Sequence, residues 1–194
     1  MQRPRGTPHH QILARACEVR TRLAAHGITR YEELDRIAEL EGIVLVRVAG
    51  PIGKDAGMAH IYETLRDPWM PSLAAPGEWR RVWAPKVRVL VRSITINPNA
   101  GVPEPEVFWH EYYHLCYSPT GTQHSERLRH TYSTEGVLHH REERRADAFA
   151  AAVLMYDAIT GAARCSMEEV RDQYGCSERS ARAVVALRDR LDAE

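Results

Sequence analysis

The chain has 194 residues, of which 44% are hydrophobic and 27% charged, and its 26 basic side chains balance its 26 acidic ones. This length and composition fit one compact domain with a small appendage. Zero net charge argues against a strongly basic nucleic-acid binder and leaves only a local patch, such as residues 141–145, for that role. No apolar stretch approaches the roughly 20 residues of a membrane span, and no signal-peptide core is present. We therefore expect a soluble, cytoplasmic protein that makes no membrane contact.

Two helices and two strands are expected in the first third of the chain. Apolar side chains recur at helical spacing over residues 8–26 and again over residues 30–41, and a glycine follows each run. Apolar runs at about 43–48 and 57–62 then predict two strands.

A third strand is expected at about residues 87–96, where apolar and polar side chains nearly alternate. Helices packed against one face of a small three-stranded sheet would give an α+β fold. Between the second and third strands, residues 66–86 interleave four prolines with three tryptophans, which excludes a regular helix. This segment is either a lid or exosite for a peptide or an excursion whose tryptophans cover the core. The second interpretation is favoured because large aromatic side chains usually pack.

The strongest chemical signal is the motif His-Glu-Tyr-Tyr-His at residues 110–114, within a helix expected over 103–117. Side chains four positions apart point from the same face of a helix, so His110 and His114 can bind one metal ion. Glu111 lies one position further round the helix. From there it can take a proton from a zinc-bound water and pass it to a leaving amine.

A third metal ligand is expected from a later element, because hydrolytic zinc usually binds three protein side chains and a water molecule. Residues 141–158 form an alanine-rich run with strong helix propensity, and Glu143 and Asp147 share one of its faces. Glu143 would bind the metal, while Asp147 would accept the free N–H of a ligand histidine and fix its tautomer. The alternative is a solvated charged face at the start of a core helix. The histidine pair favours the metal site, with about one zinc ion per chain.

The residue that stabilises the transition state is less clearly indicated. Residues 117–141 are expected to be irregular and to link the two metal helices. His139 or His140, close to Glu143, could hold a substrate carbonyl or the developing oxyanion. Tyr112 and Tyr113 are candidates for the same role, and the sequence does not separate the four.

Two segments together resemble the signatures of the ImmA/IrrE metallopeptidase family. They are Val-Phe-Trp-His-Glu-Tyr-Tyr-His at residues 107–114 and Glu-Arg-Arg-Ala-Asp-Ala-Phe-Ala at residues 143–150. The strand Ile-Thr-Ile-Asn at 94–97 is similar to the one that precedes the metal helix in that family. The chain departs from the family at residues 153–156, where a proline that often ends the second helix is absent.

The resemblance implies a zinc-dependent endopeptidase that performs limited proteolysis of a partner protein, often a helix-turn-helix repressor encoded in a phage, mobile element or stress operon. It implies His110, His114 and Glu143 as zinc ligands, with Glu142 as the nearest competitor for the third place. It also implies Glu111 as the catalytic base. The alternative is a non-proteolytic regulator that binds a repressor or DNA and whose metal only braces the fold.

The resemblance further divides the chain into a zincin-like metallopeptidase domain over residues 1–164 and a helix-turn-helix-like region over 165–194. In the latter, Ser166 and Ser177 are placed to cap two helices separated by a glycine turn. The second helix carries Arg179, Arg182 and Arg188. Because nearby acidic side chains cancel much of their field, a protein-docking or packing role is favoured over DNA binding.

Overall fold

The computed structural model describes residues 8–49, 56–66, 87–117 and 135–193, and within these ranges it describes side chains except at 62–66, 87–89 and 135–140. The Trp- and Pro-rich segment over residues 67–86 therefore lies outside the description. So does most of the linking segment, over residues 118–134.

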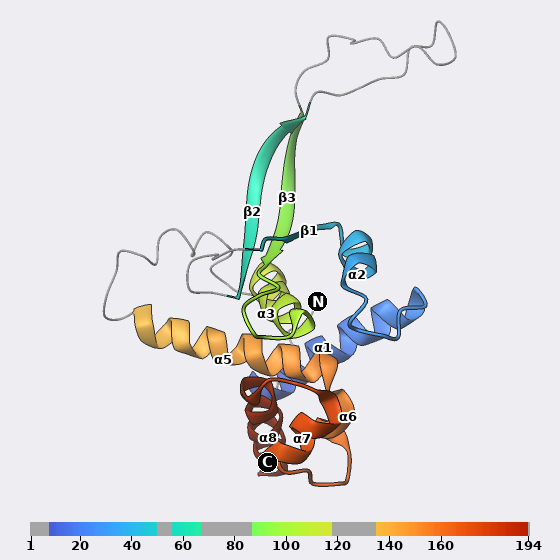
Figure 1. The fold of residues 1–194 in the computed structure, drawn as a ribbon, viewed down its shortest axis with the longest axis vertical. Helices are drawn as coiled ribbons and strands as arrows, with labels where there is room; N and C mark the ends of the chain where they lie inside the picture. Colours follow the sequence, from blue (N-terminus) through green and yellow to red (C-terminus); the bar gives the residue numbers. More distant parts are fainter. Residues whose placement is uncertain (1–7, 50–55, 67–86, 118–134, 194) are drawn as a thin grey trace, which may run out of the picture.

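The described residues form a mixed α+β structure, as expected (Figure 1). Its helices are α1 (Pro8–Ala25), α2 (Leu34–Glu41), α3 (Glu104–Tyr117), α5 (Glu135–Leu154), α6 (Tyr156–Thr160), α7 (Met167–Tyr174) and α8 (Glu178–Asp192). Its strands are β1 (Ile43–Arg47), β2 (Gly57–Arg66) and β3 (Val87–Ile96). No helix in these ranges is long and apolar enough to cross a membrane.

The sheet has the order β1-β3-β2, with β1 parallel and β2 antiparallel to the central strand. Gly57 at the start of β2 pairs with Ile96 at the end of β3, so this end of the ribbon lies beside α3. Ile94 and Ile96 are fully buried there, whereas Leu90, further along the ribbon, is 68% exposed. The sheet therefore contributes to the core at one end and projects from the body at the other (Figure 1).

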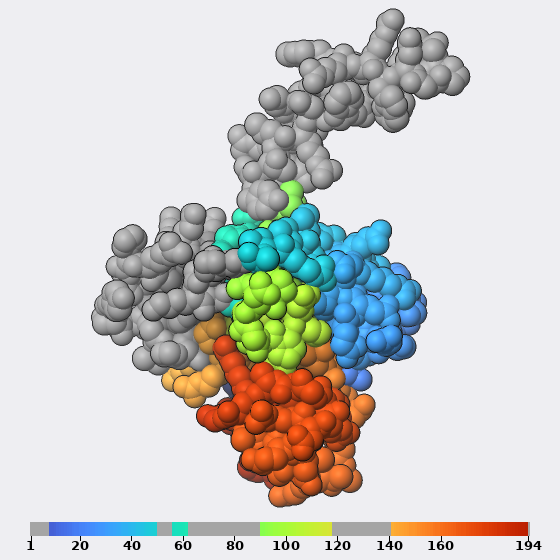
Figure 2. Space-filling view, viewed as in Figure 1, coloured from blue at the N-terminus to red at the C-terminus, as the bar shows by residue number. Residues whose placement is uncertain are grey.

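Helix α3 lies at the centre of the molecule, with the sheet on one side and α5 on the other (Figure 1). Its side chains Phe108, Trp109 and Tyr112 are almost completely buried, and the Tyr112 ring stacks on Phe149 of α5 with 5° between their planes. In the space-filling view, α3 is enclosed between β1 above it and the C-terminal helices below it (Figure 2). One hydrophobic cluster includes residues of α1, α3, α5 and α8.

The two serine caps and the glycine turn between the C-terminal helices are present as the sequence predicts. Ser166 and Glu169 form a complete capping box at α7, Gly175 ends that helix with a positive φ of 59°, and the Ser177 side chain caps α8. Yet the core continues across the predicted boundary between residues 164 and 165, because α8 packs directly on α5. The C-terminal region is thus part of the same packed body.

Three elements differ from the prediction in where they begin or end. The helix expected over residues 30–41 begins only at Leu34, after a turn, and the strand expected over 57–62 extends to Arg66 along its partner β3. The second metal helix begins earlier than predicted, at Glu135, within the segment expected to be irregular. It also ends earlier, because Met155 leaves the helical conformation and a separate α6 follows.

Arg188 is a buried cation in the C-terminal region, with only 8% of its surface exposed. Its Nε and Nη1 atoms have no hydrogen-bond partner within the described parts of the chain. A guanidinium removed from water without full pairing destabilises the folded state, while an apolar side chain of similar length would not.

We therefore expect Arg188→Met to raise the free energy of unfolding by about 1 kcal/mol or more. Thermal unfolding followed by circular dichroism measures the change. Arg182→Met is the matched control, because Arg182 lies on the exposed face of α8 and pairs only with Glu178, one turn away. A lower melting temperature for Arg188→Met would contradict this interpretation.

Candidate metal centre

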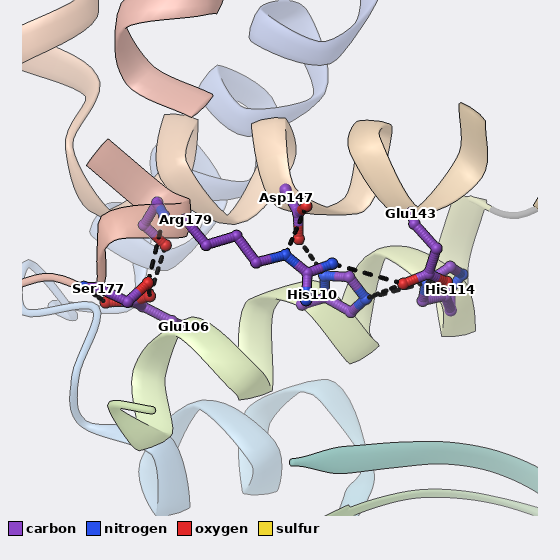
Figure 3. A network of polar contacts seen from close by, with 8 residues as sticks. Glu106, His110, His114, Glu143, Asp147, Ser177 and Arg179 are labelled. Atoms are coloured by element: carbon purple, nitrogen blue, oxygen red, sulfur yellow. Dashed lines mark hydrogen bonds and ion pairs between the residues drawn. The ribbon is translucent and has the colours of Figure 1, made fainter. Parts of the chain in front are cut away.

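Two histidines of α3 face one glutamate of α5 (Figure 3). The Nε2 atoms of His110 and His114 are 3.2 Å apart, and each lies 3.2 Å from one carboxylate oxygen of Glu143. The side chains are partly accessible, with exposed fractions of 14%, 19% and 28% in the same order. The donor atoms therefore lie near the surface of the described part of the chain.

This group could hold a metal ion. Zinc binds nitrogen and oxygen ligands at about 2.0–2.1 Å, and a tetrahedral arrangement then separates the ligand atoms by about 3.3 Å. The observed triangle of donor atoms has nearly that size. Two imidazoles with one carboxylate are also the donor set of many hydrolytic zinc sites.

Asp147 orients the first histidine. Its Oδ1 atom is 2.8 Å from His110 Nδ1, so the proton of a neutral imidazole is held on Nδ1 and Nε2 is left to face His114 and Glu143. Glu143 and Asp147 are i and i+4 on α5, which places both carboxylates over the same face of α3.

Arg179 of α8 completes the polar network and was not predicted as a site residue. Its Nε donates to Asp147 Oδ2 at 2.7 Å, and its Nη2 lies 3.6 Å from a Glu143 oxygen (Figure 3). The sequence contains no signal for this contact beyond an arginine on a predicted helix. The contact depends on how α8 docks onto α5.

The docking of α8 depends on a buried glutamate in the first turn of α3. Glu106 is 6% exposed and accepts hydrogen bonds from the Ser177 backbone N–H and from the hydroxyls of Ser177 and Ser180. The bonds fix the start of α8 two residues before Arg179. The same α3 that carries the histidines thus also positions the arginine.

The three arginines predicted on the second helix do not form one outward row. Arg179 is engaged at the metal site, Arg182 pairs with Glu178, and Arg188 is buried. The three arginines therefore have different environments, and the role of this helix in docking or DNA binding stays a prediction.

Glu111 lies between the metal site and the sheet. Its charge contributes to the raised pKa of His110, after the hydrogen bonds that His110 makes with Asp147 and Glu143. On its other side is Gly57, the first residue of β2; a Cβ there would lie 3.1 Å from the Glu111 γ-carbon and only 2.3 Å from Val107. A glycine is required at this position for β2 to approach α3 so closely.

The remaining candidates lie elsewhere. The Tyr112 hydroxyl donates to Glu41 and accepts from Arg22, both at 2.9 Å, at the contact of α3 with α1 and α2. The buried Tyr113 ring packs against Phe149. The Tyr112 hydroxyl is therefore engaged away from the metal-binding group, whereas the Tyr113 ring also meets the His114 ring edge-on, with 6.0 Å between their centroids. A transition-state role for Tyr113 stays a prediction.

His139 and His140 belong to the first turns of α5, and their side chains lie outside the described residues. The competitor Glu142 does not belong to the metal-binding group, whose third member is Glu143.

Comparisons with protein-family models, curated proteins and solved structures found no match to this chain. The interpretation of the site therefore depends on its own geometry.

The ionic environment couples protonation to metal binding. Burial lowers the pKa of His110, but its hydrogen bonds to Asp147 and Glu143 outweigh this effect and raise it from 6.5 to about 9. Burial raises the pKa of Glu143, but its bonds to His110 and His114 outweigh this and hold it far below its usual value. Stripped of metal, the site holds a proton on His110 at neutral pH.

A histidine whose pKa is higher in the folded than in the unfolded state stabilises the protein fully when the pH is below the unfolded-state pKa. This stabilisation is lost as the pH rises through the folded-state pKa. We therefore expect the metal-stripped protein to lose stability between about pH 6.5 and 9. Zinc binds the neutral imidazole, so its affinity should rise over the same range, with a proton released on binding. Urea unfolding and zinc titration at several pH values measure both trends. His110→Gln is the control, and persistence of both trends in this variant would assign them to another group.

Glu143→Ala should weaken zinc binding by about a hundredfold or more, whereas Glu142→Ala should change it little. The two variants remove the same charge from adjacent positions, so only the loss of a ligand distinguishes them. Zinc content after dialysis against a chelator is the measurement. Equal retention of zinc in both variants would exclude Glu143 as the third ligand.

Proposed function

We propose that the chain is a zinc-dependent endopeptidase of the ImmA/IrrE type that cuts a partner protein at a limited number of sites. The observation that carries this proposal is the triangle formed by His110, His114 and Glu143, with Glu111 beside it. The resemblance of residues 107–114 and 143–150 to that family supports it. The same resemblance makes a cytoplasmic helix-turn-helix repressor the expected substrate.

Zinc, when bound, would polarise the scissile carbonyl and increase the acidity of water. Glu111 is placed to receive the proton of the attacking water on its carboxylate and to deliver it to the leaving amine. Asp147 keeps the His110 ring in one tautomer throughout, and Arg179 holds Asp147 from the far side. These residues keep the donor atoms at fixed positions while Glu111 carries the proton.

The sheet supplies a place for an extended peptide. Strand β2 is at the edge of the sheet, and no described strand pairs with its outer side. Its first residue, Gly57, lies directly beside Glu111. Unpaired N–H and C=O groups on an edge strand bind extended peptides as an added strand, which would bring a peptide bond towards the catalytic base.

Glu111→Gln separates proteolysis from the alternative of a non-proteolytic regulator with a structural metal. The amide keeps the size of the side chain and leaves all three ligands, but it cannot accept the proton of water. We expect full zinc content and a loss of cleavage of about a hundredfold or more. The measurement compares new protein N-termini in cells of the native host that produce either version at matched levels.

One partner protein cut only in cells with the unaltered chain would support the peptidase and identify its substrate. Identical N-termini, with the same regulatory phenotype from both versions, would contradict the peptidase and support the binding alternative.

A further inference from the structure

A groove with a volume of about 920 Å³ lies between the beginning of α1, the middle of α5 and one face of α8. It is separate from the metal triangle, whose three ligands do not line it. Its residues come from three elements far apart in the sequence, so its shape depends on the packing of α8 on α5 and α1.

The groove is strongly basic although the whole chain has no net charge. Six arginines line it, two or more from each of two helices: Arg141, Arg144, Arg145, Arg179, Arg182 and Arg190. The acidic side chains in the lining are Asp147 and Glu178, which pair with Arg179 and Arg182 respectively. The remaining arginines give the groove an excess of positive charge and a complementary surface for carboxylates or phosphates.

The base of the groove is apolar. Ile12 of α1, Ala148 of α5 and Leu187 of α8 are among the side chains there. The described lining contains no Phe, Tyr or Trp on which nucleic-acid bases could stack. An apolar base beneath a basic rim instead fits a peptide that carries both acidic and apolar side chains.

The length of the groove gives the size of its occupant. From Arg179 to Arg190, α8 rises about 16 Å, which matches roughly five residues of extended polypeptide. One end of this row is Arg179, which also contacts Asp147 and Glu143. A peptide lying along the arginines would therefore end beside the metal centre.

We propose that this groove binds an acidic, partly apolar segment of the protein substrate and holds it while a neighbouring segment reaches the metal centre. The binding itself is independent of catalysis, but the role of the occupant as a substrate depends on the function proposed above. Charge pairing with arginine on a desolvated surface supplies specificity, and it makes binding sensitive to salt.

The test uses the full-length, zinc-loaded Glu111→Gln protein, so that binding is measured without cleavage. The probe is a fluorescein-labelled ten-residue peptide of alternating glutamate and leucine. A peptide with glutamine in place of glutamate and a labelled ten-nucleotide oligothymidylate are compared with it by fluorescence anisotropy. We expect the acidic peptide to bind at least tenfold more tightly than either.

Arg141→Glu combined with Arg182→Glu reverses one charge on each wall of the groove and should weaken binding of the acidic peptide at least tenfold. The matched control combines Arg30→Glu with Arg171→Glu, which makes the same change in net charge at exposed positions outside the groove. It should change affinity by less than twofold. Zinc content and thermal unfolding are measured for each double variant. If the double glutamate variant does not fold, Arg141→Gln combined with Arg182→Gln replaces it, and we expect it to weaken binding of the acidic peptide at least threefold.

Absence of binding by the acidic peptide, or an equal loss in the groove and control variants, would overturn the proposal. Tighter binding of the oligonucleotide at the same arginines would overturn it in favour of a nucleic-acid site. Absence of cleavage by the unaltered chain in cells would contradict the proposed function alone and leave the binding result in place. Cleavage in cells that persists when Arg141→Glu and Arg182→Glu are introduced into the otherwise unaltered chain, although these changes abolish peptide binding, would overturn only the role of the groove in substrate binding.

Discussion

The metal centre depends on the register between α3 and α5. A zinc ion needs its donor atoms at separations fixed to a few tenths of an ångström, and two donors come from one helix and the third from the other. Stacked and tilted aromatic rings hold this register, with Phe149 of α5 packed among Trp109, Tyr112 and Tyr113 of α3. These rings occupy the buried face of α3, and the two histidines occupy its partly open face. The tyrosines within the motif thus contribute packing that keeps the ligands in place.

A second set of contacts ties the C-terminal helices to the same centre. Glu106 binds the start of α8, and Arg179 extends from that helix to Asp147. A buried carboxylate is stable only when hydrogen bonds replace its lost water, and here the cap of α8 supplies them. The helix-turn-helix-like region predicted as an appendage therefore packs against the metal site and helps to orient its residues.

The sequence predicts those parts of the fold and site that depend on local periodicity. The pairs His110 with His114 and Glu143 with Asp147 follow from helical spacing, and the caps at Ser166 and Ser177 follow from local hydrogen bonding. Contacts between distant elements leave no such pattern. The sequence could not show that Arg179 would reach Asp147 or that Tyr112 would turn towards Glu41, and it gave no sign that the helix would break at Met155. Each of these depends on tertiary packing, which overrides local preference.

The position of Arg179 would couple binding in the groove to binding of a metal ion. Its guanidinium lines the groove and also holds Asp147, which in turn orients a metal-binding imidazole. A peptide in the groove that strengthens or weakens the hydrogen bond between Arg179 and Asp147 would change the affinity for metal by some factor. Thermodynamic reciprocity then requires the metal to change the affinity for the occupant by the same factor. Loading with metal and capture of a partner would in that case regulate each other through a single side chain, without any large movement of the fold.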